Sequence, residues 1–284
     1  MRFLRLFAAI LMAEFSGHLQ LRAARREHGR TVLAEQSFRA PFHLSKPYWD
    51  VDTGVLLVQV VNPTAGILEG DRLESEIACE GGAAMLVTTP SASRVFRMRG
   101  GKAECRQRFE VKKGGWLEVL PEPLVPHRGS TYRQTTVVDV EDGGALFFVD
   151  QLMPGRVAHG EAWEWDRLSL ELEVRVAGEL ALRERLDQGG GELKAMARFA
   201  GTGDEACFAN AVLLGAEVEA VDVRERVRGL HGDGVWVGAS ALRRGGWSVK
   251  VVARDAVELR RTLKDVRAEL AAVFPQLGCE LRKL

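Results

Sequence analysis

Short segments in which apolar and polar residues alternate, separated by paired glycines, constrain this fold more than any other feature of the sequence. In the run from Leu168 to Val176, every second residue is leucine or valine and the residues between them are polar. This period of two is that of a strand with one buried face. Glycines punctuate the chain at Gly81-Gly82, Gly100-Gly101, Gly114-Gly115, Gly143-Gly144, Gly189-Gly190-Gly191 and Gly245-Gly246. Strands bounded by such turns favour a sandwich, a barrel or a coiled β architecture over βαβ units.

Other segments repeat the pattern. The runs from Leu73 to Cys79 and from Ala103 to Val111 alternate in the same way, whereas the run from Val55 to Val61 is almost continuously apolar. The first two predict strands with one buried face, and the third predicts a strand buried on both faces. The spacing of the strands is too uneven for a strict solenoid repeat. The pattern therefore predicts a mainly β protein without deciding which all-β form it takes.

Helical periodicity is found only late in the chain. We predict a strand over 207–214, a helix over 217–228 and a hairpin of 236–242 with 247–252. Asp255 then predicts an N-cap, and Pro275 ends the run that follows it. One apolar stripe marks this last helix: Leu259, Leu263, Val266, Leu270 and Val273. The stripe fits packing against the sheet and, alternatively, a face that docks a partner.

The charge balance bears on the partners of the protein. Lysine plus arginine and aspartate plus glutamate number 39 each, so the formal net charge is zero. A chain without net positive charge is not drawn as a whole to nucleic acid or to an anionic membrane. We therefore expect neither nucleic acid nor a membrane as a partner.

The sequence lacks the familiar signatures of catalysis and tight metal binding. It has no G-x-x-x-x-G-K-[ST] loop, no G-x-G-x-x-G fingerprint, no H-E-x-x-H and no G-x-S-x-G. Its six histidines are dispersed, and no two have a chelating spacing. Its four cysteines, Cys79, Cys105, Cys207 and Cys279, are widely separated, which indicates reduced thiols in a cytoplasmic protein. We predict no catalytic residues, no tightly bound cofactor and no strong metal site.

The first 17 residues form a separate segment. Its apolar core after Arg5 is short, Glu14 follows at once, and a small-x-small cleavage site is not clear, so the segment does not fit a signal peptide. It is also too short to span a bilayer. Residues 1–17 are predicted to be an N-terminal extension or the product of a mis-assigned start, with translation beginning at Met1 or at Met12. Residues 18–284 are predicted to form a single domain.

The stretch that carries most information about function is a double turn followed, one strand later, by a hydroxyl-rich segment. Asn62 to Asp71 holds Pro63, Gly66 and Gly70, which allow two sharp reversals within ten residues. The second segment, Thr88 to Arg97, is rich in threonine and serine and includes Arg94 and Arg97. Taken alone, such hydroxyls most often bond to their own backbone.

These two segments resemble the motifs of the UreD (UreH) family of urease accessory proteins, in which a turn ending in Gly-Asp is followed by Thr-Thr-x-x-x-(Ser/Thr)-(Arg/Lys)-Val-(Phe/Tyr)-Arg. Leu117 to Pro123 and Gly155 to Glu161 match further motifs in the expected order, and Arg30 to Glu35 also fits. Pro90 and the turn at Thr64-Ala65-Gly66 depart from the family pattern. The residues that match the family motifs at the sites singled out are Gly70, Asp71, Thr88, Thr89, Arg94, Arg97, Gly155, Arg156, Gly160 and Glu161.

The resemblance implies a β-helix-like stack of sheets with a short C-terminal helical part. It implies a non-enzymatic scaffold that binds the urease apoprotein and recruits UreF and, through it, the GTPase UreG, for insertion of nickel into the urease active site. A homodimer within that complex is compatible with it, and nickel would be bound only in transit. Candidates for a transient metal relay are Glu69, Asp71, Asp150, His159 and Glu161.

Two readings from other classes remain open. A secreted-type carbohydrate-active β-helix or sandwich enzyme would use paired carboxylates and an aromatic-lined cleft, and six tryptophans are available. A β domain that kept the family's fold and lost its partners is the other. For each relay candidate, the structural alternative is a solvated or salt-bridged turn residue. Arg156 and Glu161 in particular are spaced to pair across a turn.

Overall fold

The structure is a computed structural model, which describes residues 16–199 and 203–281 of the 284-residue chain. The predicted N-terminal extension lies outside these residues, except that Ser16 and Gly17 begin the first strand. No helix in the described part of the chain is long and apolar enough to span a membrane.

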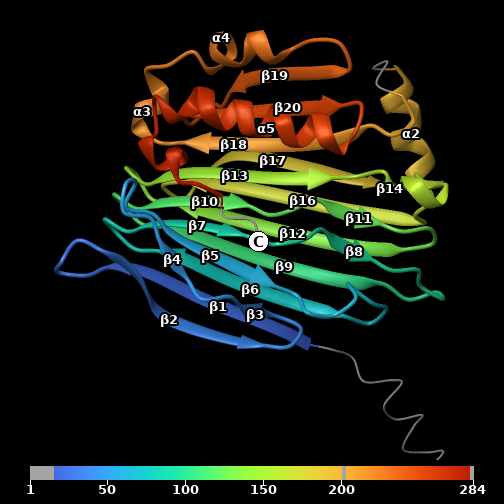
Figure 1. Ribbon diagram of the computed structural model, residues 1–284, viewed down its shortest axis with the longest axis horizontal. Helices are drawn as coiled ribbons and strands as arrows, with labels where there is room; N and C mark the ends of the chain where they lie inside the picture. Colours follow the sequence, from blue (N-terminus) through green and yellow to red (C-terminus); the bar gives the residue numbers. More distant parts are fainter. Residues whose placement is uncertain (1–15, 200–202, 282–284) are drawn as a thin grey trace, which may run out of the picture.

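Two large sheets lie one behind the other (Figure 1). The seven-stranded sheet has the order β17 (Glu179–Gln188), β16 (Arg167–Val176), β12 (Thr131–Val140), β9 (Ala103–Val111), β6 (Arg72–Cys79), β1 (Ser16–Arg25) and β2 (Thr31–Arg39). The main path of the eleven-stranded sheet is β19 (Val235–Ala241), β20 (Trp247–Ala253), β18 (Cys207–Leu214), β13 (Ala145–Leu152), β10 (Trp116–Leu120), β7 (Ala84–Thr88), β5 (Leu56–Val61) and β3 (His43–Leu44). Its remaining strands are β4 (Tyr48–Trp49), β8 (Ser93–Val95) and β11 (Leu124–Pro126), and β14 (Gly155–Arg156) pairs separately with β15 (Glu161–Ala162).

Three coils of chain connect the sheets. In each coil a strand of the seven-stranded sheet turns into a strand of the eleven-stranded sheet: β6 into β7, β9 into β10, and β12 into β13. The paired glycines make these turns, and the turns stack, because the Gly82 amide donates to the Gly114 carbonyl at 3.0 Å and the Gly114 amide donates to the Gly143 carbonyl at 2.8 Å. All three residues have positive φ, which glycine adopts without strain. Corresponding strands of successive coils pair in parallel, so the predicted β-helix-like stack is confirmed.

The opposite end of the stack is built differently. There the chain returns through longer segments of unequal length, which hold β8, β11 and the β14–β15 pair. Strands β6, β9, β12 and β16 therefore begin at residues 72, 103, 131 and 167, which explains why the sequence lacks a strict period. We call this end the rim and define it as residues 62–71, 89–102, 121–130 and 153–166.

The C-terminal part covers the outer face of the eleven-stranded sheet. Helix α5 (Ala256–Ala271) starts at the predicted N-cap, where the Asp255 carboxylate accepts hydrogen bonds from the amides of Val257 and Glu258, both at 2.9 Å. Four of the five predicted stripe residues are buried: Leu259, Leu263, Val266 and Leu270. The fifth, Val273, is partly buried against the same hydrophobic cluster. The short helices α3 (Ala216–Glu219), α4 (Val223–Val227), η2 (Arg228–Leu230) and η3 (Pro275–Gly278) complete this layer. The apolar stripe of α5 therefore packs against the eleven-stranded sheet.

Two predictions about helices are wrong. The helix expected over 217–228 is broken, because the Asp222 carboxylate accepts from the amides of Arg224 and Glu225 and so starts α4 as a separate helix. The glycine triplet at 189–191 does not only separate strands, because it also begins α2 (Gly190–Phe199). The chain there lies so close to Trp163 that a Cβ on Gly190 would be 2.2 Å from the Trp163 carbonyl oxygen. Strand β17 was not predicted. The remaining short helix, η1 (Val157–His159), lies in the rim.

Candidate functional site

A row of polar side chains crosses the inner face of the seven-stranded sheet. Ser75, Gln107 and Thr136 are cross-strand partners on β6, β9 and β12, and the row continues through Leu172 to Glu184 on the edge strand β17. Each of these positions lies in the alternation that elsewhere carries apolar residues such as Ile77 and Phe109. Polar groups on the buried phase of a strand need partners or a hydrated space.

A second polar row crosses the inner face of the eleven-stranded sheet. Asp150, Asn210 and Lys250 are cross-strand partners on β13, β18 and β20. Thr89 and Pro121, which directly follow the paired residues at the ends of β7 and β10, extend the row.

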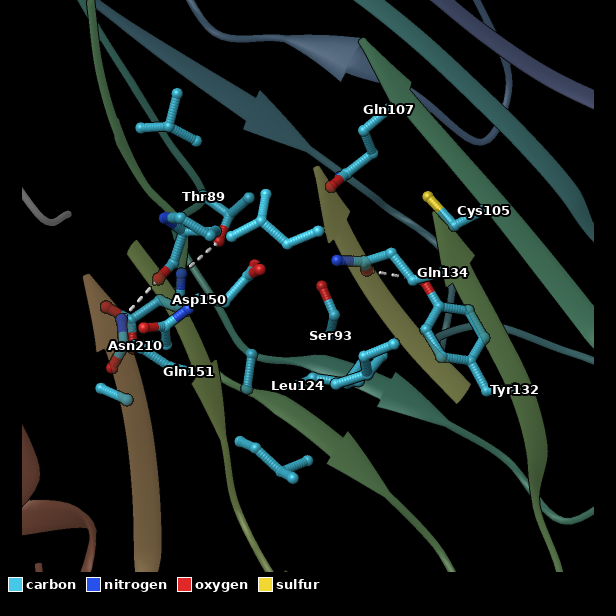
Figure 2. Close-up of a pocket in the computed structure, with 18 of the residues that line it drawn as sticks. Thr89, Ser93, Cys105, Gln107, Leu124, Tyr132, Gln134, Asp150, Gln151 and Asn210 are labelled. Atoms are coloured by element: carbon cyan, nitrogen blue, oxygen red, sulfur yellow. Dashed lines mark hydrogen bonds between the residues drawn. The ribbon is translucent and has the colours of Figure 1, made fainter. Parts of the chain in front are cut away.

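Between the two rows lies a cavity of about 730 Å³. Figure 2 shows Asp150 and Asn210 on one side of it and Gln107 and Gln134 on the other. Exposed residues of the lining lie both at the rim and at the flank. At the rim, the exposed residues Thr64, Ser91 and Arg94 line it. At the flank, Glu184 and Lys250 line it between the sheet edges; Lys250 is exposed and Glu184 is partly buried.

The amides and hydroxyls on one wall form a hydrogen-bonded chain. The Tyr132 hydroxyl donates to Gln134 Oε1 at 3.1 Å, the Gln134 amide donates to Thr136 Oγ1 at 3.4 Å, and the Thr136 hydroxyl donates to Gln107 Oε1 at 3.1 Å (Figure 2 draws the first of these). A connected chain of this kind fixes the orientation of each member.

Asp150 is the carboxyl group that faces the cavity from the opposite wall. Burial raises its pKa to about 7, and the nearby negative charge of Glu184 adds to the shift, whereas a hydrogen bond from Gln134 opposes it. Among the described residues it forms no ion pair. Asp150 therefore changes charge close to neutral pH.

Glu184 joins the two sheets at the flank. Its carboxylate accepts a hydrogen bond from the Asn210 amide and one from the Lys250 ammonium group at 2.6 Å. A second contact across the same flank is the ion pair of Arg244 with Glu179. These contacts hold the edge strand β17 against β18 and β20.

The Gly-Asp turn uses its carboxylates to hold the rim together. Asp71 is buried, and its carboxylate accepts a hydrogen bond from the Leu68 amide at 2.8 Å; burial raises its pKa. The Glu69 carboxylate accepts from the amides of Arg99 and Gly101, both at 2.7 Å. Gly70 has φ of 85°, the left-handed conformation expected of a glycine turn. Both carboxylates are therefore occupied by backbone amides.

The hydroxyl-rich segment is partly bonded to its own backbone, as its composition predicts. The Thr89 hydroxyl donates to the Ser91 carbonyl at 3.2 Å and accepts from the Glu122 amide at 2.8 Å. The Thr88 hydroxyl instead donates to the Leu120 carbonyl of the neighbouring strand at 2.6 Å. Arg94 and Arg97 at the end of this segment are exposed.

The last motif forms a tight loop around an ion pair. Arg156 and Glu161 pair as predicted, with nitrogen-to-oxygen distances of 2.6–2.9 Å, and this pairing lowers the pKa of Glu161. Gly155 has φ of 119°, and a Cβ there would lie 2.4 Å from the Glu161 carbonyl oxygen. Gly160 is also left-handed, and His159 before it is exposed.

The structure does not bring the five relay candidates together. Asp150 lines the cavity, whereas Glu69, Asp71, His159 and Glu161 lie in the rim outside its lining. No group of three or more His, Cys, Asp or Glu suited to a metal ion occurs among residues 16–199 and 203–281. Burial raises the pKa of Cys79, Cys105 and Cys207 to about 12 and that of Cys279 to about 11, so these thiols are protonated at neutral pH.

Sequence reasoning missed most of the cavity lining, although a signal for it was present. Ser75 and Gln107 interrupt otherwise apolar phases of their strands. Thr136, Asn210 and Glu184 sit on segments whose phase was unclear or unassigned from the sequence.

Comparison with known proteins identifies the family. A family model described as UreD urease accessory protein matches residues 16–282, a span that includes every described residue. The chain belongs to the UreD family. It is 64% identical over 272 residues to the urease accessory protein UreD of Opitutus terrae. That alignment covers 95% of this chain and 100% of the Opitutus protein. It is 40% identical over 146 residues to UreD of Yersinia enterocolitica, which covers 51% of this chain and 45% of that protein.

Several of the UreD motif residues lie close to the cavity. Nine of the ten family-motif residues named from the sequence lie in the rim, and the tenth, Thr88, ends β7 beside it, whereas the further match at Arg30 to Glu35 lies at the start of β2. Of these motif residues, Thr88, Thr89 and Arg94 also line the cavity. Part of the UreD motif set therefore lies where the lining of the cavity is exposed at the rim.

Proposed function

We propose that this UreD-family chain is a non-enzymatic scaffold of urease maturation. It binds the urease apoprotein, recruits a UreF-like protein and, through it, a UreG-like GTPase, and so serves the insertion of nickel into the urease active site. The proposal includes a cytoplasmic location and allows a homodimer within the complex.

The observation that carries the proposal is where the polar groups of this family member are placed. Its interior polar residues line a cavity between two sheets, and this cavity has one mouth at the family motifs and another at the flank. A large β platform with a polar cavity suits a protein that binds other proteins at its surface and lets a metal ion pass through its interior. Catalysis by acid and base or by a nucleophile would instead need paired reactive groups at one point.

Nickel enters this proposal as cargo. The cavity offers oxygen ligands from Asp150, Gln134, Gln151 and Asn210, which suit weak and exchangeable binding of a divalent cation. Cys105 also lines the cavity, but burial raises the pKa of its thiol to about 12, so a metal ion would have to displace this proton before the sulfur could act as a thiolate ligand. Weak oxygen ligands favour transit over storage.

Reconstitution tests the proposal. The chain is co-expressed with the UreF-like protein of its own host, captured by affinity and analysed by size-exclusion chromatography with mass determination, first alone and then with the GTPase and urease apoprotein. We expect one complex with the UreF-like protein, and urease activity when nickel and bicarbonate are added to the full set. A folded chain that elutes alone with every partner, or an apoprotein that stays inactive with the full set, would contradict the scaffold function.

The carbohydrate-enzyme alternative finds little support in the cavity. None of the six tryptophans is among the described residues that line it. The tryptophans that this alternative would use as platforms for sugar rings are therefore missing from the described lining around Asp150 and Glu184. Turnover of a polysaccharide panel by the chain alone would revive this alternative.

A further inference from the structure

Three arginines in one segment of the rim have no counter-ion among the residues that the structure describes. Arg94, Arg97 and Arg99 are exposed, and no described carboxylate forms an ion pair with any of them. Many other surface arginines are paired, as in Arg108 with Asp139 at 3.0 Å or Arg167 with Asp187 at 2.8 Å, and the exposed arginines outside the rim that are not in a described ion pair, such as Arg133 and Arg261, are dispersed along the chain.

The neighbouring charges do not neutralise these arginines. The Glu69 carboxylate is directed at backbone amides, and Glu161 and Glu164 pair with Arg156 and Arg128. The residues gather closely around the segment 127–129: the charges of Arg156 and Arg94 both lower the pKa of His127, after the larger effect of its burial, and the Arg97 side chain lies over Gly129. The rim as a whole has six basic and six acidic side chains, but the segment that holds Arg94, Arg97 and Arg99 forms a locally positive patch beside the mouth of the cavity.

The backbone that presents this charge is held firmly. The Ile67 amide donates to the Arg94 carbonyl at 2.7 Å, the Phe96 amide donates to the Ile67 carbonyl at 2.9 Å, and the Met98 amide donates to the Gly129 carbonyl at 3.0 Å. Gly66 permits this close packing, because a Cβ there would lie 2.5 Å from the Arg94 carbonyl oxygen. A surface whose backbone is fixed before binding loses less entropy when a partner docks.

An apolar side chain lies in the same part of the rim. Leu68 is 46% exposed although its backbone amide is tied to buried Asp71. Arginines around an exposed apolar residue form a common kind of protein-binding surface, because guanidinium groups pair with carboxylates in a bidentate manner and the apolar residue supplies contact area.

We propose that Leu68, Arg94, Arg97 and Arg99 form a docking surface for an acidic patch on a protein partner of the urease maturation assembly, which seats that partner over the rim mouth of the cavity. This inference rests on the proposed function. The occupant is a protein surface that presents carboxylates. The zero net charge of the chain gives it no general attraction to nucleic acid, which argues against a polynucleotide as the occupant. Binding of a polynucleotide to these arginines is the competing outcome of the test.

Charge reversal tests the docking surface. Dissociation constants of Arg94→Glu/Arg97→Glu are measured for the purified UreF-like protein and, separately, for urease apoprotein, at low and at physiological salt. We expect binding of one of the two partners to weaken about tenfold or more, mainly through a slower association rate, with the loss largest at low salt. Leu68→Ser should weaken the same partner without changing the salt dependence.

The matched control is Arg25→Glu/Arg243→Glu, which makes the same charge change at exposed arginines away from the rim, at the end of β1 and in the β19–β20 turn. The control should bind both partners like the wild type, and circular dichroism should show all variants folded. The inference is overturned if Arg94→Glu/Arg97→Glu binds both partners as the wild type does, if the control loses binding equally, or if the wild type binds a random DNA duplex as tightly as it binds the partners. A wild-type chain that binds neither partner contradicts the proposed function itself.

Discussion

Asp150 is the residue whose chemistry is most altered by its surroundings. It projects into the cavity, where burial and the nearby Glu184 raise its pKa from 3.8 to about 7. The folded protein therefore binds this proton more tightly than the unfolded chain does. The stability that this provides is fully present below about pH 4 and is lost as the pH rises to about 7.

Replacing Asp150 with asparagine removes this pH dependence. Relative to the wild type, the free energy of unfolding of Asp150→Asn should increase by roughly 3 to 4 kcal/mol between pH 4 and pH 8. Urea denaturation at a series of pH values measures the difference. Asp142→Asn, in the exposed β12–β13 turn, controls for the loss of one negative charge, and a parallel pair of stability curves for Asp150→Asn and wild type would refute the assignment.

Two rim glycines offer a second test at this scale. Gly155→Ala should destabilise the protein by roughly 2 to 4 kcal/mol, because its positive φ and the carbonyl of Glu161 both oppose a Cβ. Gly160→Ala is the matched control, since Gly160 also has positive φ but nothing lies within 4 Å of its Cβ position, and it should cost about 1 kcal/mol. Thermal and chemical denaturation compare them. Equal losses would show that the close approach at Gly155 does not matter.

At the scale of elements, a buried ion pair fixes helix α5 on the sheet. The Arg267 guanidinium donates to the two Glu118 carboxylate oxygens at 2.6 and 3.0 Å and to the Cys279 carbonyl at 2.9 Å. Glu118 is fully buried and the Arg267 side chain is 10% exposed. The pair therefore links β10, α5 and the segment after η3 in one place.

Breaking this pair should be costly. Arg267→Met leaves the Glu118 carboxylate buried without a partner, and we expect a loss of roughly 3 to 5 kcal/mol, whereas Glu118→Leu/Arg267→Met should recover most of it. Arg261→Met, at an exposed position of the same helix, should change stability by less than about 0.5 kcal/mol. Urea denaturation measures all three. A double variant as unstable as the single one would mean that the site needs the charges themselves.

The elements also show what the sequence could and could not predict. Strands with clean alternation, such as β6 and β16, were predictable because one face of each is buried on the core. Strand β17 was not, since as an edge strand it carries Arg183, Glu184 and Arg185 in succession and its burial does not alternate cleanly. The cavity could not be predicted either, because it depends on the register that places Gln107 beside Thr136 and Asp150 beside Asn210, and no local pattern specifies register between strands far apart in sequence. Of the relay candidates and the ten family-motif residues, only Asp150, Thr88, Thr89 and Arg94 line it.

At the scale of the whole molecule, the stacked coils tie both sheets into one body. Strands β7, β10 and β13 lie in the interior of the eleven-stranded sheet and are mostly buried, whereas β2 and β19 are edge strands with many exposed residues. Opening should therefore start at the edges.

Native-state hydrogen exchange checks this order. Amides of β7, β10 and β13 should exchange last, with protection close to that of global unfolding, and those of β2 and β19 should exchange first. Mass spectrometry of peptides from each strand gives the comparison. Protection of β19 equal to that of β10 would show that the edge opens only with the whole fold.

The two ends of the stack differ in what they allow to change. At the glycine end, each turn contacts the next through its backbone, so an inserted residue in one turn would displace its neighbours. At the rim, the returning segments already differ in length while the sheets they join stay in register. Evolution can therefore lengthen, shorten or recharge the loops of one end while the other maintains the architecture, which lets related chains acquire different partners without a new fold.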